Sequence, residues 1–482
     1  MNNLNFLVDV LKESPVFKTL EKNVKPGRTV CASGLSTINK SNIIYALCRL
    51  KGVTAFCLAS DEKEAQTLCN DLSCMGLRAY VYPVRDFNFL DFQSRSHEYE
   101  HARLKVLLKL LNHECDVAIA CVDAAAQLTV PRNVLEQSVI EFEEGKELSL
   151  EKATKALTLL GYERFDAVEG SGQFSLRGGI LDFFMPDSDY PVRCEFWGDE
   201  ITDLSYFDIE TQRRFKKADK ITLSPSTEIV IEDRAALADK IEHKAKLLRS
   251  KNSAKAKEKL FSEAELIRSG AMIANADKFI NQIYDKPESL FDYLDRNTLV
   301  FASEFTAIQE RGKSMDFISN ETLMQGFEDG TLCRGFDRFA LTFNECTEFL
   351  QSHGTIVLEN FVHGSMPIKL SEIISFSTKQ ISAWGGSYKQ LKEDVDGLFT
   401  PESKGVIFAG TERAAKNLCD TFNADGINAV YSEGADKISK GELLVMQGAL
   451  SAGFEYPSQK FFAITYSQVS YRPEKSKKKK KE

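Results

Sequence analysis

The segment Gly34–Ser41, GLSTINKS, carries the residue types of a loop that binds nucleotide phosphates. It follows an apolar run, precedes a helical pattern, and fits GxxxxGK[ST] except that Asn39 stands at the second glycine. Such a loop turns backbone N–H groups toward the phosphates, which two β-branched residues in its middle disfavour. The candidate residues of this degenerate nucleotide site are Gly34, Lys40 and Ser41, of which Lys40 would meet phosphate and Ser41 magnesium.

A nucleotide hydrolase also needs an apolar strand that ends in Asp-Glu, with one carboxylate for Mg²⁺ and one that positions water. The best candidate is LVFASE, where Ser303 occupies the Asp position and Glu304 remains. The metal carboxylate and the loop glycine are both missing. We therefore expect a relic of a nucleotide site, with no catalytic residue and no ATP or Mg²⁺ cofactor.

A second motif, HEYEH at residues 97–101, matches the H-E-x-x-H pattern of zinc proteases. On a helix it would place His97 and His101 on one face, with Glu98 as the base. However, Glu100 adds a charge inside the motif, and no third ligand is evident. We interpret the segment as the exposed start of a helix whose histidines have partners within the protein, and we expect no metal site.

Residues 170–214 alternate in period two and break at Gly178-Gly179 and Gly198-Asp199, which predicts a small antiparallel sheet built from hairpins. Successive strand side chains point to opposite faces, so Arg193 and Trp197 would share the outer face. A rigid aromatic beside a planar guanidinium is typical of a binding surface. In the alternative interpretation Trp197 is buried or caps a strand end, because Trp is highly buried on average.

The composition, with 43% hydrophobic residues, indicates a globular protein. Because 482 residues are too many for a single hydrophobic core, we expect several domains. A formal net charge of −9 argues against a general nucleic-acid coat. The 11 cysteines form no CxxC pair, so they indicate buried thiols of a reducing compartment rather than a disulfide framework or zinc ribbon. With no leader pattern and no apolar run long enough for a bilayer, we expect a cytoplasmic protein without a membrane partner.

Strands and helices alternate in the first 122 residues, which predicts a parallel α/β layer. The expected strands are 28–33, 53–60, 78–84 and 116–122, and the expected helices are 39–50, 61–75 and 99–112. A helix ending at Gly161 leads into the hairpin sheet, residues 228–284 read as charged helices, and 298–302 as a strand. After Gly335 a second α/β pattern begins with TIVLEN and continues through KGVIFAG, INAVY, ELLVMQ and KFFAITYS.

Three segments together resemble the amino-terminal half of the bacterial transcription-repair coupling factor, Mfd. They are GYERFDAVEGSGQFSLRGGILDFFMP, PVRCEFWGDEITDLSYFDIETQR and LSAGFEYPSQKFFAIT. The first two also resemble the excision-repair protein UvrB, to which that half of Mfd is related. The likeness runs more loosely through the degenerate loop, VYPVRDFNFLDFQS, LFDYLDRNTLVFASE and the basic tail, so it covers essentially the whole chain.

The resemblance implies a multidomain α/β fold, in which a degenerate P-loop domain of the RecA or helicase type carries an inserted α+β domain and is followed by a second α/β domain. The expected boundaries are 1–132 for the first part of the P-loop domain, 133–222 for the inserted domain, 223–335 for the helical region and second part, 336–472 for the later α/β domain, and 473–482 for a basic tail or linker.

The resemblance also implies a partner, because the inserted domain would bind the damage-recognition protein UvrA. The family residues of that contact fall on Arg177, Arg193 and Trp197, where relatives commonly have Phe at the last position. The family continues into modules that bind RNA polymerase and translocate on DNA with ATP, and we expect those activities outside this chain. The expected role is a UvrA-recruiting adaptor in transcription-coupled excision repair. The alternative is a UvrB-like, ATP-dependent DNA-handling enzyme that uses Lys40 and Ser41.

Overall fold

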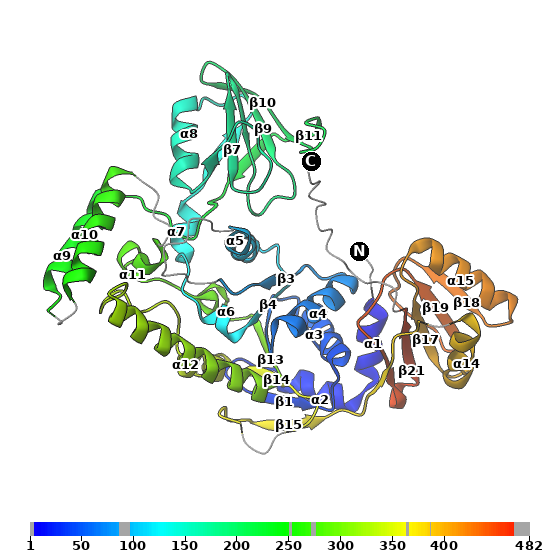
Figure 1. Cartoon of the computed structure of the whole chain (residues 1–482). Helices are drawn as coiled ribbons and strands as arrows, with labels where there is room; N and C mark the ends of the chain where they lie inside the picture. Colours follow the sequence, from blue (N-terminus) through cyan, green and yellow to red (C-terminus); the bar gives the residue numbers. More distant parts are fainter. Residues whose placement is uncertain are drawn as a thin grey trace, which may run out of the picture. The chain divides into compact units, whose positions relative to one another are not determined.

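The chain folds into two compact units in the computed structural model, which describes residues 4–85, 97–249, 253–270, 276–362, 366–385 and 387–466. Unit 1 consists of residues 1–79, 297–306 and 351–482, and unit 2 of residues 80–296 and 307–350. Each unit is therefore assembled from segments that are far apart in the sequence (Figure 1). The predicted basic tail lies outside the described residues, as do residues 86–94 of VYPVRDFNFLDFQS.

Parallel strands in the order β15-β1-β14-β13-β2 form the first sheet of unit 1. Their bounds are Val30–Ser33 (β1), Ala55–Ala59 (β2), Leu299–Ser303 (β13), Thr355–Leu358 (β14) and Glu372–Ser375 (β15). Every residue of β1, β2, β13 and β14 is buried, as expected for apolar parallel strands covered by helices. The helices of this part are α1 (Asn5–Glu13), α2 (Pro15–Asn23), α3 (Thr37–Lys51) and α4 (Glu62–Cys74).

One strand differs from the prediction. The run TIVLEN, which the sequence pattern assigns to the second α/β region, forms β14 in the first sheet, between β1 and β13. An apolar run shows that a strand is buried on both faces, but it does not show which sheet the strand joins. That assignment of β14 was therefore wrong.

A second sheet in unit 1 has six strands in the order β16-β20-β21-β17-β19-β18. The strands are β16 (Lys379–Ile381), β17 (Lys404–Phe408), β18 (Ala429–Ser432), β19 (Glu442–Met446), β20 (Gly453–Tyr456) and β21 (Phe461–Thr465). The helices α14 (Tyr388–Leu398) and α15 (Glu412–Ala424) bury Leu391, Val395 and Phe422 in its core, and η3 spans Pro457–Gln459. The second α/β fold is confirmed here.

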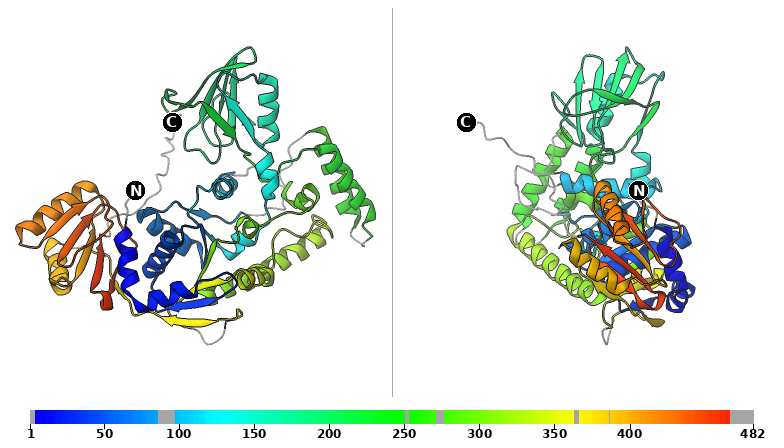
Figure 2. Two further views of the ribbon diagram at one scale, coloured as in Figure 1. Left: turned by 180° about the vertical axis from the view of Figure 1, so that it is seen from behind. Right: turned by 90° about the vertical axis from the view of Figure 1, so that its right-hand side faces the viewer.

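The predicted hairpin sheet lies in unit 2, with strand order β11-β10-β9-β8-β7-β6. Its strands are β6 (Glu163–Arg164), β7 (Gln173–Arg177), β8 (Ile180–Phe183), β9 (Val192–Trp197), β10 (Glu200–Phe207) and β11 (Arg214–Lys217). Both expected turns are present, with positive φ at Gly178 (64°) and Gly198 (62°). The helix α8 (Leu150–Leu159) packs on one face of the sheet (Figure 2). Beside it, β5 (Ile140–Glu143) pairs with β12 (Lys220–Leu223).

The other elements of unit 2 are mainly helical. They are β3 (Ala79–Tyr82), α5 (Glu98–Leu111), β4 (Val117–Cys121), α6 (Val122–Ala126), α7 (Arg132–Gln137), α9 (Arg234–Leu247), α10 (Ser253–Ser269), η1 (Ala276–Phe279), α11 (Ile280–Ile283), η2 (Leu290–Tyr293), α12 (Phe305–Asp329) and α13 (Phe343–His353). Parts of α12 and α13 extend into residues of unit 1.

The helical region predicted from residue 228 begins later, at Arg234. Residues 228–233 are not helical, and Glu228 is fully buried. Its carboxylate accepts hydrogen bonds from the buried Arg103 guanidinium (Nε to Oε1, 2.6 Å) and from Thr129 (2.8 Å). A charged residue in a polar stretch suggests a solvated helix, but here a distant arginine compensates the buried charge.

The described helices include none that is both long and apolar enough to cross a membrane. The four strands predicted between residues 28 and 122 and the three helices between them are present, with ends shifted by a few residues. The predicted α/β class with an α+β insertion is therefore confirmed. The domain boundaries listed above stay predictions.

Gly34 provides a test of this packing, because it combines a φ of 78° with a close approach to the Phe376 carbonyl oxygen, which a Cβ atom would overlap. We expect Gly34→Ala to destabilise the protein by about 3 kcal/mol or more. The matched control is Gly52→Ala, whose φ is 63° with no atom within 4 Å, so only the strain of about 1 kcal/mol applies. Scanning calorimetry that gave the two variants the same loss of Tm would contradict the close approach.

Candidate partner-binding face and residual nucleotide site

The inserted sheet has one apolar and one polar face. Val192, Cys194 and Phe196 of β9 point into the core that α8 closes, together with Leu181 and Leu204 of the neighbouring strands. On the opposite face, cross-strand pairing places Ser175, Asp182, Arg193 and Ser205 in one row across β7, β8, β9 and β10. We call this the outer face. The period-two alternation of the sequence therefore predicted both faces correctly.

A buried carboxylate organises the outer face. Asp182, whose side chain is 1% exposed, accepts two bonds from Arg193 (Nε to Oδ1, 2.7 Å; Nη2 to Oδ2, 2.8 Å). It also accepts one bond of 2.7 Å from Nη2 of Arg177. Parallel N–H bonds to both oxygens fix the plane of the guanidinium, which a single contact would not do.

Arg193 is held on its other sides as well. Its guanidinium carbon lies 4.4 Å from the centre of the Phe207 ring, and its nitrogens donate to the backbone oxygen and the side chain of Gln212 at 3.2 and 3.0 Å. The hydrogen bond to Asp182 raises the pKa of Arg193, against the opposing effect of burial. With only 13% of its side chain exposed, Arg193 is mainly a positioning residue, whereas Arg177 is half exposed.

Trp197 projects from the end of this face. It is the last residue of β9, it pairs across the Gly198-Asp199 turn with Glu200, and its exposed fraction is 82%. Burial of Trp197, one part of the alternative interpretation, is therefore wrong, whereas its position at a strand end, the other part, is observed. The two-residue turn leaves the indole with few neighbours, because β9 ends where the chain reverses.

Sequence reasoning missed the acidic partners of this face. Asp182 holds both arginines, and Arg214 of β11 pairs with Glu195 and with Asp203, the latter at 3.0 Å. The alternation of GGILDFF put Asp182 on the outer face, opposite Arg193 once β8 and β9 pair. That signal was available, but only after the register of the two strands was assumed.

The degenerate loop offers few free groups to a phosphate. The N–H groups of Gly34 and Leu35 donate to the carbonyl oxygens of Asn360 and Glu359, both at 3.1 Å. Ser36 precedes the first turn of α3, and its hydroxyl donates to Asn39 Oδ1 at 2.7 Å. Phosphate loops depend on several N–H groups that converge on the ligand, and here two of the loop's N–H groups are bonded to the protein backbone.

Lys40 lies among carboxylates where a nucleotide lysine would meet phosphate. Its buried ammonium donates to Glu304 (2.6 Å), Ser303 (2.9 Å) and Glu64 (3.2 Å). Burial acts to raise the pKa of Glu64, but Lys40 and hydrogen bonds from Ser303 and Ser60 hold it below its ordinary value. Glu359, close by, has its pKa raised to about 7 by burial and by the charge of Glu304. The structure thus brings Lys40, Ser303 and Glu304 together, as expected, but supplies the anions from the protein itself.

Ser41 and Asn39 are also engaged within unit 1. Ser41 Oγ donates to the buried Asp71 at 3.3 Å, and Asp71 accepts two bonds of 2.7 Å from Ser451. The amide of Asn39 donates to the Tyr456 hydroxyl at 3.4 Å. Burial raises the pKa of Asp71 to about 6, with the hydrogen bonds opposing it. These contacts give no support to the alternative of an ATP-dependent enzyme.

The HEYEH segment forms the start of α5. His97 precedes the helix and its Nδ1 lies 3.0 Å from Glu100 Oε2, while the His97 and His101 rings stack with centroids 5.9 Å apart. The other oxygen of Glu100 accepts the backbone N–H of Glu228 at 2.8 Å, and Glu98 is exposed. Glu100, which counted against the motif, therefore has a structural role that joins α5 to the segment after β12.

The chain is similar in sequence to known repair proteins. Residues 140–229 match a family model described as the UvrB interaction domain. The transcription-repair-coupling factor of Bacillus subtilis is 26% identical over 97% of this chain and 41% of its own length. Those of Staphylococcus epidermidis and Staphylococcus aureus are 25% and 22% identical over 83% and 99% of the chain. The predicted resemblance is confirmed, and the chain spans about two-fifths of the length of the Bacillus relative.

The two arginines of the outer face differ in their expected effects on stability. Arg193→Ala would leave the buried Asp182 carboxylate without its bidentate partner, so we expect a loss of about 3–5 kcal/mol in the free energy of unfolding of the inserted domain. Arg177→Ala removes a half-exposed pair and should cost about 1 kcal/mol or less. Native-state hydrogen exchange of the β8 and β9 backbone amides, followed in the whole chain, measures both. Equal losses would contradict the structural role of Arg193.

The Lys40 cluster predicts a pH dependence. The lowered pKa of Glu64 stabilises the fold above its ordinary value of 4.5, and that contribution is lost as the pH falls. Without Lys40 the carboxylates repel one another when ionised. We expect Lys40→Met to lower Tm, and this deficit to grow from pH 3 to pH 6, as the pH rises through the ordinary Glu64 pKa of 4.5. The exposed Lys155, paired with Glu151, provides the control Lys155→Met, which should show a small deficit at both values. A Lys40→Met deficit independent of pH would contradict the account.

Proposed function

We propose that this protein recruits UvrA in transcription-coupled DNA excision repair, and that its inserted domain is the UvrA-binding part. The match of residues 140–229 to the UvrB interaction domain carries the proposal, since the outer face lies within that range. The relatives that match the rest of the chain are named for coupling transcription to repair. We assign to this chain the recruitment of UvrA. Contacts with RNA polymerase and DNA are proposed for parts of the relatives outside the matched two-fifths.

The geometry of the outer face supports a division of roles among the three contact residues. Trp197 is the exposed apolar anchor, because a rigid indole gives a large contact area for little lost side-chain entropy. Arg177 has guanidinium donors in addition to the one bonded to Asp182, and these are free to pair with a carboxylate of UvrA. Arg193 acts through Asp182, because it holds the carboxylate that in turn orients Arg177.

Contacts within the chain also indicate how the surface is prepared before binding. Asp182, Arg193 and Gln212 form a hydrogen-bonded row, so the backbone under Trp197 is fixed by β8, β9 and the loop after β10. A surface that is ordered in advance loses less entropy on association. Binding would then depend on a few anchors rather than on the total area buried.

Titration calorimetry with UvrA from the same organism tests the proposal. We expect Trp197→Ala to raise Kd by at least about 30-fold, which corresponds to about 2 kcal/mol, because it removes the apolar anchor. Arg177→Ala should raise Kd less, and Arg193→Lys should raise it through loss of the fork, since a lysine cannot bond both oxygens of Asp182.

The matched control is Phe215→Ala, which removes an exposed aromatic from the edge strand β11 of the same sheet. It should change Kd by less than about twofold, because Phe215 is not one of the three contact residues. If Trp197→Ala and Arg177→Ala both fold normally and both bind UvrA with the affinity of the unmodified chain, the outer face is not the UvrA-binding surface.

A further inference from the structure

The helix α12 packs closely against neighbouring residues of unit 2 at two glycines, Gly312 and Gly326, which lie about four turns apart. A Cβ on Gly312 would overlap the Phe343 ring, and one on Gly326 would lie 2.7 Å from Leu332 Cδ1. Glycine at these positions lets the helix approach its neighbours closely. Their separation of 14 positions corresponds to about 21 Å of helix at about 1.5 Å per residue.

Between Gly312 and Gly326, one stretch of the helix is exposed and partly apolar. Residues 317–322 are all exposed, including Phe317 at 66% and Ile318 at 62%. A surface helix normally turns its apolar side chains toward a core. Here two large apolar residues stand in solvent on consecutive positions, in the part of α12 that borders a groove.

That groove, which we call the α12 groove, has a volume of about 630 Å³. This size falls within the usual range for binding pockets. Its apolar lining consists of Met315, Ile318, Leu323, Phe339 and Leu341. Because Ile318 lines the groove and is also mostly exposed, the groove opens to solvent along α12.

The floor of the α12 groove is held by backbone hydrogen bonds. Leu128 N–H donates to Phe339 O and Leu341 N–H donates to Ala126 O, both at 2.8 Å, so residues 339–341 run alongside the end of α6. Asp316 of α12 accepts the N–H of Phe343, the first residue of α13, at 3.0 Å. The groove is therefore formed before any partner arrives, which lowers the entropy cost of binding.

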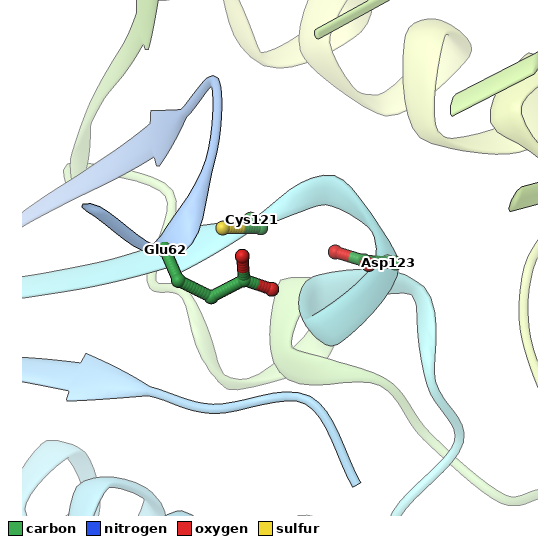
Figure 3. A group of neighbouring side chains, drawn as sticks. All are labelled: Glu62, Cys121 and Asp123. Atoms are coloured by element: carbon green, nitrogen blue, oxygen red, sulfur yellow. The ribbon is translucent and has the colours of Figure 1, made fainter. Parts of the chain in front are cut away.

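The charged groups of the lining are mostly acidic. They are Asp123, Asp316, Asp337 and Glu345, against one cation, Arg338. Asp123 stands at the start of α6, just after Cys121 ends β4 (Figure 3). Each carboxylate is tied to its place, for example Asp123 by Arg311 at 2.7 Å and Asp337 by the Gly335 N–H at 3.1 Å. Asp123 is paired with Arg311, and Glu345 with Arg338 at 2.9 Å, whereas Asp316 and Asp337 accept backbone N–H groups. The charges of Asp316 and Asp337 beside an apolar floor favour a partner with cationic and apolar groups together.

We propose that the α12 groove binds a cationic amphipathic helix of a partner protein. A partner helix of three to four turns matches the distance between Gly312 and Gly326. Its apolar side would contact Ile318, Leu323 and Phe339, and its lysines or arginines would lie toward the rim carboxylates. Apolar anchors supply the affinity, and the acidic rim supplies the selection for positive charge. This surface is separate from the outer face of the inserted sheet, and it does not depend on UvrA binding.

The test uses the whole chain and synthetic 15-residue peptides labelled with a fluorophore. One peptide has Leu and Lys arranged to form an amphipathic helix, a second has Glu in place of Lys, and a third has the composition of the first with its leucines spread around the helix. Fluorescence anisotropy should give micromolar binding for the first and at least tenfold weaker binding for the other two.

Three variants locate the site. Ile318→Ser removes an exposed apolar anchor and should weaken the first peptide at least fivefold, with Tm unchanged. Asp337→Asn removes a rim charge and keeps an acceptor for the Gly335 N–H, so it should weaken binding two- to threefold at low salt and less at high salt. The control Phe361→Ser alters another exposed apolar residue, which lies outside the lining, and should have no effect.

Two results would overturn the proposal. Equal binding of the three peptides, or equal effects of Ile318→Ser and Phe361→Ser, would show that the peptide adheres without using the α12 groove. Sedimentation that revealed a dimer of this chain, dissociated by Ile318→Ser, would make a second copy the occupant in place of a cationic partner helix.

Discussion

The buried pair between Asp182 and Arg193 is the constraint on which the candidate interface depends. A carboxylate that is 1% exposed needs compensation, and the bidentate guanidinium supplies it while the Phe207 ring covers the guanidinium face. This pair joins β8 to β9 and leaves Arg177 and Trp197 as the exposed members of the outer face. In the proposed assignment, stability and UvrA recognition share one carboxylate, so a change at Asp182 or Arg193 would affect both.

The polar groups of the candidate nucleotide site are engaged in contacts within the protein. Lys40 of α3 places its ammonium beside Ser303, the last residue of β13, and Glu64 and Glu304 provide the negative charge that phosphates would bring. Asn39 and Ser41 take part in contacts with Tyr456 and, through Asp71, with Ser451. The side chains that would contact a nucleotide form hydrogen bonds with other side chains of unit 1 instead. The fold keeps the strand, loop and helix of a phosphate site while its polar groups serve stability.

The sequence predicted local features well, because they depend on nearby residues. Period-two alternation and the glycine turns identified the hairpins and the two faces of β9. Partners distant in the chain were not predictable. β14 pairs with β1, and Glu228 pairs with Arg103, which lies 125 positions away in the chain. Asp182 accepts hydrogen bonds from both Arg177 and Arg193. A buried charged residue can be recognised from the sequence only when its oppositely charged partner is already known.

Photo-cross-linking tests the central claim most directly. A photoreactive phenylalanine analogue placed at position 197 of the full chain would stand at the exposed end of the outer face. Irradiation with UvrA should give a covalent adduct from position 197, and a much weaker one when the analogue replaces Phe361, another exposed aromatic residue. Adducts of equal yield from the two positions, or none from position 197 while UvrA still binds, would contradict the assignment of this face.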